Sequence, residues 1–358
     1  MKDNRDSSVY SDLKIFYHSE KVGDILAEKR TAPIYVRIKP TNTCNQNCYY
    51  CSSKDDNIPE ERKLDYYASI PWEKLQEIIQ DLSDMGVKAV TFSGGGEPLI
   101  YPHIEDALSL VKEKHIDYSM ISNGQALEGK KAKLLADAKW LRISLESACA
   151  ETYEKIRGVH TFDKVIDNIK NFVQIKSPNC TVGINCVVTR DNYEEIYDLC
   201  RIASEIGVNN IKLSPMRLDG SLSQYHNTIE EEVQKQILCA KQDFENQQFT
   251  IIDKYDGDSS LNEGYEKPYC HCMIQEVFTV IGADCKVYLC HQRAYTKDGD
   301  IADLTKQSFK EAWYSEETVR KVRELDVRKA CNFRCVFDER NELLNHLASI
   351  DKNHINFI

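Results

Sequence analysis

Three cysteines stand close together near the start of the chain, in the spacing C-x3-C-x2-C. They are Cys44, Cys48 and Cys51, and they follow an apolar alternating run, residues 33–38, that predicts a β-strand. The three thiols would therefore share one loop at the C-terminal end of a strand. Soft sulfur ligands grouped in this way suit a transition metal or an iron–sulfur cluster. A set of incidental buried cysteines is the alternative.

A structural zinc ion matches these three cysteines poorly. Structural zinc sites have four ligands, and the nearest histidines, His18 and His103, are far away along the chain. A cubane cluster held by three cysteines keeps one iron without a protein ligand, and an open coordination position is where a metal centre can react. The loop therefore predicts a reactive centre.

Composition is that of a globular protein. The 358 residues are 42% hydrophobic and 29% charged, which allows one large or two modest domains. No apolar run approaches the roughly 20 residues that span a bilayer, and the N-terminus lacks the apolar core of a signal peptide. We therefore expect a cytoplasmic protein with no membrane partner. The formal net charge of −11 disfavours non-specific binding to nucleic acid but still permits a local basic patch for a phosphate.

The cysteine content also points to metal chemistry. Fourteen cysteines are many for a protein of a reducing compartment, where clustered cysteines more often bind metals than form disulfides. A second group lies toward the C-terminus and comprises Cys270, Cys272, Cys285, Cys290, Cys331 and Cys335. The remaining ones stand singly in apolar surroundings and are expected to be small core residues: Cys149, Cys180, Cys186, Cys200 and Cys239.

Strands and helices alternate after an accessory helix at residues 11–27. The predicted strands are 34–38, 89–92, 118–121, 141–145, 182–188 and 211–214, and the predicted helices are 71–85, 103–114, 130–138, 162–175, 193–206 and 229–244. Such alternation implies an α/β fold with a parallel sheet and right-handed crossovers. Six units suit a partial (β/α)6 barrel of the TIM type. In barrel sheets the chemistry gathers where the strands end.

Polar residues do follow the predicted strands. After the second strand comes Ser93-Gly94-Gly95-Gly96-Glu97, in which the glycines allow close backbone approach and Glu97 offers a carboxylate to an amine. A plain turn is the alternative. Asn123 follows the third strand in an Asn-Gly turn. On the fourth strand, Ser144 and Glu146 are two residues apart and point to the same face.

The cysteine spacing, with Tyr50 as the aromatic residue before the third cysteine, resembles the signature of radical S-adenosylmethionine (SAM) enzymes. The resemblance implies that a 4Fe-4S cluster on the three cysteines binds SAM. It further implies that Gly95, Gly96 and Glu97 contact the amino group of SAM, that Ser144 and Glu146 contact its ribose, and that Asn123 faces it. Arg190, at the end of the fifth strand, is a candidate for the SAM carboxylate, with helix capping or surface ion pairing as alternatives. Arg217, after the sixth strand, is a candidate catalytic acid, base or substrate contact.

The alternation stops at about residue 268. Residues 277–281 and 286–290 predict a β-hairpin around a Gly/Asp turn, followed by a helix at 309–325 and a last helix from about residue 339. This arrangement resembles the twitch extension, a shortened SPASM domain that holds an auxiliary 4Fe-4S cluster. The resemblance implies Cys272, Cys290, Cys331 and Cys335 as ligands, with Cys270 and Cys285 as alternates.

The C-terminal part also departs from the twitch pattern. Cys285 stands where the pattern usually has a glycine, and the closing pair is spaced C-x3-C. Four cysteines in two pairs also suit zinc. No cysteine follows Cys335, so no second auxiliary cluster is expected.

The expected domains are an accessory helix (1–30), a radical SAM partial barrel (31–250), a twitch domain (251–340) and a C-terminal helix or tail (341–358).

The resemblance implies an enzyme that cleaves SAM with an electron from a reductant such as flavodoxin or ferredoxin. The resulting 5′-deoxyadenosyl radical removes a hydrogen atom from a substrate. An auxiliary cluster would favour net oxidation, as in a radical SAM oxidoreductase. Only about 30 residues precede the first strand, too few for a leader-binding domain. We therefore expect a small polar substrate that is carbohydrate-, aminocyclitol- or nucleotide-linked. A peptide-modifying maturase (oxidation, epimerisation or crosslinking) and a non-catalytic iron–sulfur electron-transfer protein are the alternatives.

Overall fold

A single ten-stranded sheet runs through the molecule, in the order β10-β9-β8-β1-β2-β3-β4-β5-β6-β7. The computed structural model describes residues 11–53, 64–216, 225–255, 265–331 and 333–356. The strands are β1 (Tyr35–Ile38), β2 (Ala89–Phe92), β3 (Asp117–Ser122), β4 (Trp140–Ser144), β5 (Thr181–Val188), β6 (Asn210–Pro215), β7 (Thr250–Asp253), β8 (Phe278–Ile281), β9 (Lys286–Tyr288) and β10 (Asp300–Asp303).

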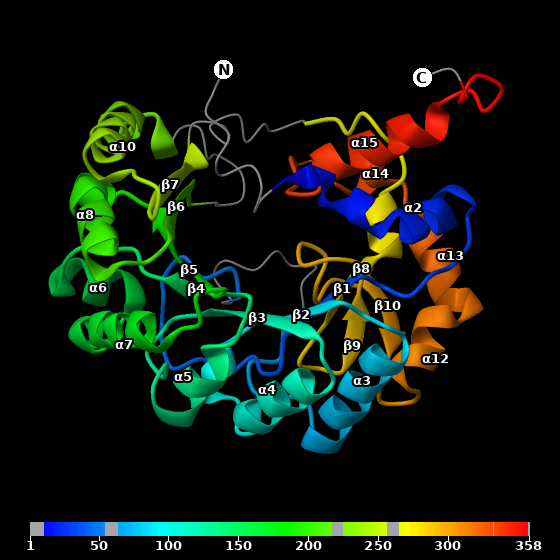
Figure 1. The fold of residues 1–358 in the computed structure, drawn as a ribbon, viewed down its shortest axis with the longest axis horizontal. Helices are drawn as coiled ribbons and strands as arrows, with labels where there is room; N and C mark the ends of the chain where they lie inside the picture. The colour runs from blue at the N-terminus through cyan, green and yellow to red at the C-terminus, as the bar shows by residue number, and fades with distance from the viewer. Residues whose placement is uncertain (1–10, 54–63, 217–224, 256–264, 332, 357–358) are drawn as a thin grey trace.

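Most of the helices line the outer side of the curved sheet, whereas the first and last helices of the chain lie against its other face beside β8 (Figure 1). The α-helices are α2 (Ser19–Leu26), α3 (Trp72–Asp84), α4 (Ile104–Glu113), α5 (Gly129–Leu135), α6 (Ala150–Arg157), α7 (Phe162–Ile175), α8 (Ile196–Ile206), α10 (Glu230–Phe244), α12 (Phe309–Tyr314), α13 (Glu316–Glu324), α14 (Val327–Ala330) and α15 (Asp338–Ser349). Short 3-10 helices are η1 (Asp12–His18), η3 (Pro98–Ile100), η4 (Tyr193–Glu195) and η5 (Met273–Glu276).

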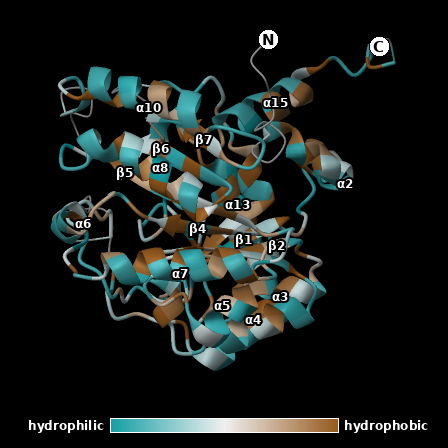
Figure 2. Cartoon of the chain, turned by 60° about the vertical axis from the view of Figure 1, so that its left-hand side comes forward, coloured by the Kyte–Doolittle hydropathy of each residue, from teal (hydrophilic) through white to brown (hydrophobic). Residues whose placement is uncertain are grey.

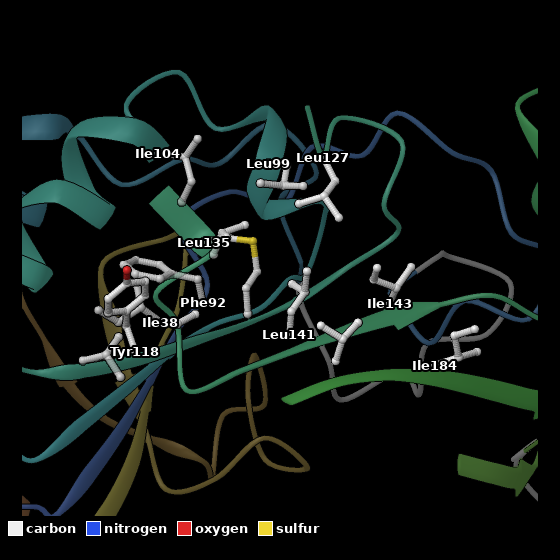
Figure 3. Packing of buried hydrophobic residues seen from close by; sticks show 14 of the residues in the cluster. Ile38, Phe92, Leu99, Ile104, Tyr118, Leu127, Leu135, Leu141, Ile143 and Ile184 are labelled. Carbon is white, nitrogen blue, oxygen red and sulfur yellow. The ribbon is translucent and has the colours of Figure 1, made fainter. Parts of the chain in front are cut away.

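The main hydrophobic core lies between the sheet and these outer helices. On α3, Leu75, Ile78 and Leu82 are fully buried at helical spacing and join the same cluster as the strand residues. Figure 3 shows side chains of this cluster, among them Phe92 and Leu141 from two strands. Figure 2 shows hydrophilic and hydrophobic residues alternating along the outer helices, as amphipathic helices on a sheet require. Because the core residues of each strand face these helices, the residues between them point to the opposite face of the sheet.

The predicted α/β partial barrel is confirmed, since β1 to β7 pair in parallel. Helix α6 and strand β7 in the barrel, and strand β10 and helix α14 in the C-terminal part, were not expected from the sequence. The helix expected at residues 309–325 is wrong as a single unit, because the backbone turns extended at Ser315. The Ser315 hydroxyl then caps α13 by accepting from the Thr318 amide.

The predicted C-terminal hairpin extends the barrel sheet. Strand β8 pairs in parallel with β1, in a register that places Tyr35 beside Phe278 and Ile38 beside Ile281. Strands β9 and β10 continue from β8 in antiparallel pairs. The strand that leads into the first cysteine loop therefore has β2 on one side and the hairpin on the other. Among the described residues, no helix is both long and apolar enough to cross a membrane.

Candidate active site

The first three cysteines lie in the loop that leaves the C-terminal end of β1. Cys48 is buried, Cys51 is partly buried and Cys44 is the most accessible. The pKa of the Cys44 thiol is raised to about 11, mainly by burial, with contributions from the nearby Glu97 carboxylate and from the thiols of Cys48 and Cys51, and the Gln46 backbone opposes the rise. The three thiols are thus electrostatic neighbours. Because a bound metal needs thiolates, its binding would have to displace their protons.

The glycine-rich turn after β2 is pressed against this cysteine loop. An added Cβ on Gly96 would stand 1.9 Å from the carbonyl oxygen of Thr43, and one on Gly95 would stand 2.1 Å from Asn42 Oδ1. The Glu97 amide donates to the Thr43 carbonyl at 2.9 Å. Only glycine fits two such close approaches, so the two loops form one unit.

Glu97 ties the end of β2 to the end of β3. Its side chain is almost fully buried, with the residue 2% exposed. One carboxylate oxygen accepts from Ser122 Oγ at 2.8 Å and from the Leu99 amide at 2.9 Å, and the other accepts from the Asn123 amide at 2.7 Å. Burial raises the pKa of Glu97, while these hydrogen bonds oppose that rise. The carboxylate is therefore held in one orientation at the strand ends.

Asn123 connects the third strand back to the cysteine loop. Its side-chain amide donates to Asn45 Oδ1 at 2.7 Å, and its own Oδ1 accepts from the Gln125 amide at 3.0 Å. The structure thus brings the predicted residues Glu97 and Asn123 together beside the loop of Cys44, Cys48 and Cys51.

Helix α6 supplies a residue that sequence reasoning missed. Arg157 Nη1 donates to Cys48 Sγ at 3.3 Å and to Gln46 Oε1 at 3.2 Å. The same guanidinium forms an ion pair with Glu146, and the two side chains are only 5% and 1% exposed. Tyr50 lies close to this pair, where burial raises the pKa of its hydroxyl and Glu146 adds to the rise. A carboxylate from the end of β4 is therefore linked through Arg157 to a cysteine of the loop.

The C-terminal end of α6 is hydrogen-bonded to the same loop. The amide of Asn47 donates to the Arg157 carbonyl at 2.9 Å. Gly158 then ends the helix with φ at +67°, a conformation that favours glycine. The Arg-Gly pair after a short amphipathic stretch is the local signal that predicts the end of this helix, but nothing local predicts its contact with Cys48.

Two further predicted residues lie at the ends of β4 and β5, and one lies outside the described residues. Ser144 is partly exposed on the face of β4 that points away from the outer helices. Arg190 donates through Nε to the Tyr225 carbonyl at 3.1 Å, and its guanidinium lies 4.4 Å from the centre of the Tyr225 ring. Arg217 belongs to residues 217–224, which the structure does not describe.

The second cysteine set gathers beside the hairpin. Burial raises the pKa of the Cys272 thiol, and Cys290 and Cys335 raise it further. Burial likewise raises the pKa of Cys290, with Cys331 adding to it, and raises the pKa of Cys335 to about 12. Cys290 is thus an electrostatic neighbour of each of the other three cysteines that the twitch resemblance names.

Helix α15 holds this second set in place. Asn341 Nδ2 donates to Cys272 Sγ at 3.3 Å. Asp338 Oδ2 accepts from the Cys335 amide at 2.7 Å, while Oδ1 pairs with the Lys267 ammonium at 2.6 Å. The side chains of Lys267 and Asp338 are 1% and 4% exposed. Buried polar groups of this kind orient ligands and adjust the charge around a metal site.

The two alternate ligands are placed differently. Cys270 is exposed and lies near Arg328. Cys285 belongs to the main core, where burial raises its pKa to about 11 and Asp284 adds to the rise. The charged groups that affect its pKa are Asp284, Lys74 and Asp303, and no cysteine of the second set is among them.

Thiol donors at both places fit the soft-ligand chemistry of an iron–sulfur cluster. At the first place, the tight packing of Gly95 and Gly96 against the cysteine loop adds a preformed cradle. Within the part of the chain that is described, no three or more His, Cys, Asp or Glu side chains converge as they would around one metal ion. The suitability of these cysteines for an iron–sulfur cluster is therefore supported by the chemistry of their sulfur donors and by the neighbouring thiols.

Comparison with known proteins identifies the fold and the domain. Residues 38–214 match the family model described as the radical SAM superfamily. A probable GTP 3′,8-cyclase of Saccharolobus islandicus is 28% identical over 287 residues, covering 77% of this chain and 88% of that protein. A protein of the same name from Pyrococcus abyssi is 31% identical over 173 residues, covering 48% of this chain and 53% of its own.

Two solved structures share the fold. Streptococcus suis SuiB, bound to the precursor peptide SuiA, superposes with a TM-score of 0.61 at 19% identity over 86% of this chain and 71% of its own. Native anSMEcpe with bound AdoMet superposes with a TM-score of 0.59 at 17% identity over 89% of this chain and all of its own. These likenesses show the fold, and the family match, with the cysteine loop at the end of β1, identifies residues 38–214 as a domain of the radical SAM superfamily.

Proposed function

We propose that this radical SAM enzyme acts on a small polar substrate and carries an auxiliary 4Fe-4S cluster in a twitch-like C-terminal part. The observation that carries the proposal is the unit formed by the two loops after β1 and β2. There the cysteine loop and the Gly95-Gly96-Glu97 turn pack without room for a Cβ. When bound, a 4Fe-4S cluster with SAM supplies one-electron chemistry that generates a substrate radical.

The residues of that unit are proposed to have separate roles. Cys44, Cys48 and Cys51 hold the cluster after losing their protons. Glu97, fixed by its three hydrogen bonds, presents negative charge to the amino group of SAM. The bare backbone of Gly95 and Gly96 lets a ligand approach closely.

The ends of the next strands are proposed to complete the SAM site. Ser144 faces away from the outer helices and is proposed to contact the ribose. Glu146 stays a candidate for the same contact, and its ion pair with Arg157 gives it a second task in fixing that guanidinium. Asn123 and Arg190 remain candidates for further contacts with SAM, and Tyr50 closes the loop beside the Glu146–Arg157 pair.

Cys272, Cys290, Cys331 and Cys335 are proposed to hold the auxiliary cluster. Besides burial, Cys290 raises the pKa of the Cys272 and Cys335 thiols, and Cys331 raises the pKa of Cys290, whereas Cys270 and Cys285 have other charged neighbours. Domain limits of 31–250 for the barrel and 251–340 for the twitch-like part are kept as a proposal, although both parts share one sheet. A second cluster near the substrate would accept an electron and favour net oxidation; a rearrangement, as the name of the cyclase relatives suggests, is the other outcome.

The relatives favour a small substrate over a peptide. The proteins named as probable GTP 3′,8-cyclases match 77% of this chain, which supports a nucleotide- or carbohydrate-linked substrate. SuiB was solved with a precursor peptide, but at 19% identity it shows the fold alone. A flavodoxin or ferredoxin is the proposed source of the electron.

The test is release of 5′-deoxyadenosine from SAM. Anaerobically reconstituted protein with a chemical reductant should produce 5′-deoxyadenosine and methionine, and Cys48→Ala should abolish the release. Cys239→Ala, a change at an exposed cysteine on α10, is the matched control and should release as much as the unmodified protein. Release from Cys48→Ala would overturn the assignment of that ligand. No release from wild type with an intact cluster would indicate a non-catalytic electron-transfer protein instead.

A further inference from the structure

Tyr295 reaches from the C-terminal part of the chain to the unit formed by the two loops after β1 and β2. It lies between β9 and β10, yet its hydroxyl donates to Asn42 Oδ1 at 2.6 Å, across 253 positions of sequence. That distance is typical of a good hydroxyl hydrogen bond. Both residues are buried, with 4% and 3% of their surface exposed. The contact therefore joins the hairpin region to the cysteine loop.

Asn42 stands at the centre of the contact between the two loops. The carbonyl groups of the residues on either side of it accept from the amides of Gly96 and Glu97, at 3.1 and 2.9 Å. An added Cβ on Gly95 would stand 2.1 Å from Asn42 Oδ1 and 3.4 Å from Tyr295 Oη. The hydrogen bond between Tyr295 and Asn42 thus lies against the backbone of Gly95.

The two ends of this hydrogen bond have fixed roles. Asn42 Nδ2 donates to the Asp65 carbonyl at 2.8 Å, so its Oδ1 is the acceptor. Tyr295 Oη accepts from the Ala283 amide at 3.3 Å, and the hydroxyl donates its single proton to Asn42. Ala283 belongs to the turn between β8 and β9. A chain of hydrogen bonds therefore runs from the hairpin turn through Tyr295 into the cysteine loop.

The ring and the backbone of Tyr295 are held in place as well. The Lys39 ammonium lies 4.7 Å from the centre of the ring, and the centre of the Tyr288 ring lies 5.3 Å away. The backbone of Tyr295 has φ at +67°, a region in which a bulky residue is strained. Such strain persists only where the surrounding contacts impose it, and it is frequent at functional sites.

The same ring borders the second cysteine set. Tyr295 belongs to the buried cluster that includes Cys290 and Phe337, and Cys272 and Cys335 pack against that cluster. Cys290 lies five residues before Tyr295 in the chain. One side chain therefore connects the surroundings of the two cysteine sets.

Packing of the hairpin against the barrel does not by itself require the hydroxyl of Tyr295. Tyr288 provides the comparison, because it lies in the same buried cluster and is 2% exposed. Its hydroxyl donates to Asp284 Oδ2 at 2.5 Å and so stays within the hairpin. The hydroxyl of Tyr295 instead leaves the hairpin and meets the cysteine loop beside Gly95.

We propose that Tyr295 is a positioning residue for SAM, which holds the backbone of Gly95 and the cysteine loop in their binding arrangement through Asn42. This inference rests on the proposed function and deepens it, because the SAM site then depends on a residue of the C-terminal part. A binding site keeps its geometry only while the residues behind it are held in place. Because Tyr295 acts through Asn42, its loss affects SAM affinity and leaves the cysteine ligands intact.

Calorimetric titration of anaerobically reconstituted protein with SAM tests this role. Tyr295→Phe keeps the ring and removes the hydroxyl, and the dissociation constant for SAM should rise about three- to tenfold, as loss of one neutral hydrogen bond predicts. Tyr288→Phe removes a similarly buried hydroxyl from the same cluster and should leave the affinity for SAM unchanged. Both variants should bind as much iron as wild type and should unfold at a lower temperature.

A double-mutant cycle measures whether Asn42 transmits the effect. Asn42→Ala removes the acceptor, so adding Tyr295→Phe to it should cause little further loss of SAM affinity, because directly coupled residues are not additive. Additive losses would overturn the positioning role. So would an unchanged SAM affinity in Tyr295→Phe, or equal losses of affinity in Tyr295→Phe and Tyr288→Phe.

Release of 5′-deoxyadenosine is measured on the same preparations. Release by wild type, with unchanged SAM affinity in Tyr295→Phe, removes the positioning role and leaves the proposed function standing. Weaker SAM binding in Tyr295→Phe, without release by wild type, supports the positioning role and removes the proposed radical chemistry. If wild type does not bind SAM, both are overturned.

Discussion

Arg157 Nη1 lies 3.3 Å from Cys48 Sγ, although the two residues are 109 positions apart in the chain. The guanidinium also pairs with Glu146, so a buried cation and a buried anion stand next to a cysteine of the first set. This contact fixes the end of α6, the end of β4 and the cysteine loop relative to one another. Hydrogen bonds to the sulfurs of a cluster influence its reduction potential, so the contact also belongs to the chemistry of the site.

The buried pair of Glu146 and Arg157 should show strong coupling in stability. Arg157→Leu leaves the Glu146 carboxylate buried without its cation and should lower the free energy of unfolding by about 3–5 kcal/mol. The double variant Glu146→Leu/Arg157→Leu removes both charges and should be less destabilised than Arg157→Leu alone. Urea unfolding of iron-free protein measures both quantities.

An exposed arginine provides the control for this pair. Arg201 forms surface ion pairs with Asp198 and Glu205 on α8, so Arg201→Leu should cost less than about 1 kcal/mol. If Arg157→Leu and Arg201→Leu lowered the free energy of unfolding by the same small amount, the buried pair would not contribute to stability.

Gly96 should be irreplaceable at the contact between the two loops. Gly96→Ala places a Cβ 1.9 Å from the Thr43 carbonyl oxygen, which belongs to the backbone and cannot swing away. The loops must separate, so we expect a lower unfolding temperature and reduced iron uptake. Thermal unfolding and iron analysis measure these effects. Gly23→Ala is the matched control, because no atom lies within 4 Å of its added Cβ and Gly23 lies inside α2. That change should stabilise by up to about 1 kcal/mol.

Cys335 and Cys270 should differ in their effect on iron content. Cys335 is an electrostatic neighbour of Cys290, whereas Cys270 is exposed beside Arg328. We therefore expect Cys335→Ala to lose one cluster's worth of iron on reconstitution and Cys270→Ala to lose none. Iron and sulfide analysis on the same preparations checks this. The reverse pattern would make Cys270 the ligand, and unchanged iron in both variants would favour zinc at the second place.

His226 should make stability depend on pH near neutrality. Its ring nitrogens contact Tyr255 Oη and the Met216 carbonyl oxygen, each at 3.0 Å. Burial lowers the pKa of His226 below its usual 6.5, and Arg190 lowers it further. The unfolded chain therefore takes up a proton as the pH falls through about 6.5 while the folded chain resists it. Stability should thus be full above that pH and decline below it.

The His226→Gln variant isolates this contribution. Between pH 7.5 and pH 5.5 the free energy of unfolding of wild type should fall more steeply than that of the variant. Urea unfolding at the two pH values measures this change. If the free energy of unfolding fell by the same amount in wild type and in the variant, the assignment of this proton to His226 would be contradicted.

Local patterns predicted those parts of the fold whose determinants are local. The strand expected at residues 89–92 and the helix expected at 162–175 have the observed limits of β2 and α7, because alternation and helical spacing are read within one segment. Helix α6 is short, with only Tyr153, Ile156 and Arg157 buried, so its periodic signal is weak. Its role comes from tertiary contacts that no window of sequence contains.

The candidate site likewise combines features that local sequence predicts with contacts that it does not predict. The spacing of Cys44, Cys48 and Cys51 is a local signal, and so is the glycine-rich turn before Glu97. The contacts of Arg157 with Cys48 and of Asn341 with Cys272 join positions 109 and 69 residues apart. Such pairs are set by how helices dock on the sheet, so residue type alone could not reveal them.

The parallel pairing of β8 with β1 has a consequence for how the chain is made. Strand β1 leaves the ribosome early, but its partner Phe278–Ile281 follows more than 200 residues later. Until then one edge of β1 has unpaired backbone groups, which is the kind of edge that invites association with other chains. Contacts so distant in sequence also form slowly. Newly made protein should therefore depend on chaperones until the hairpin is synthesised, and shortening the chain before β8 should yield aggregates rather than a smaller stable barrel.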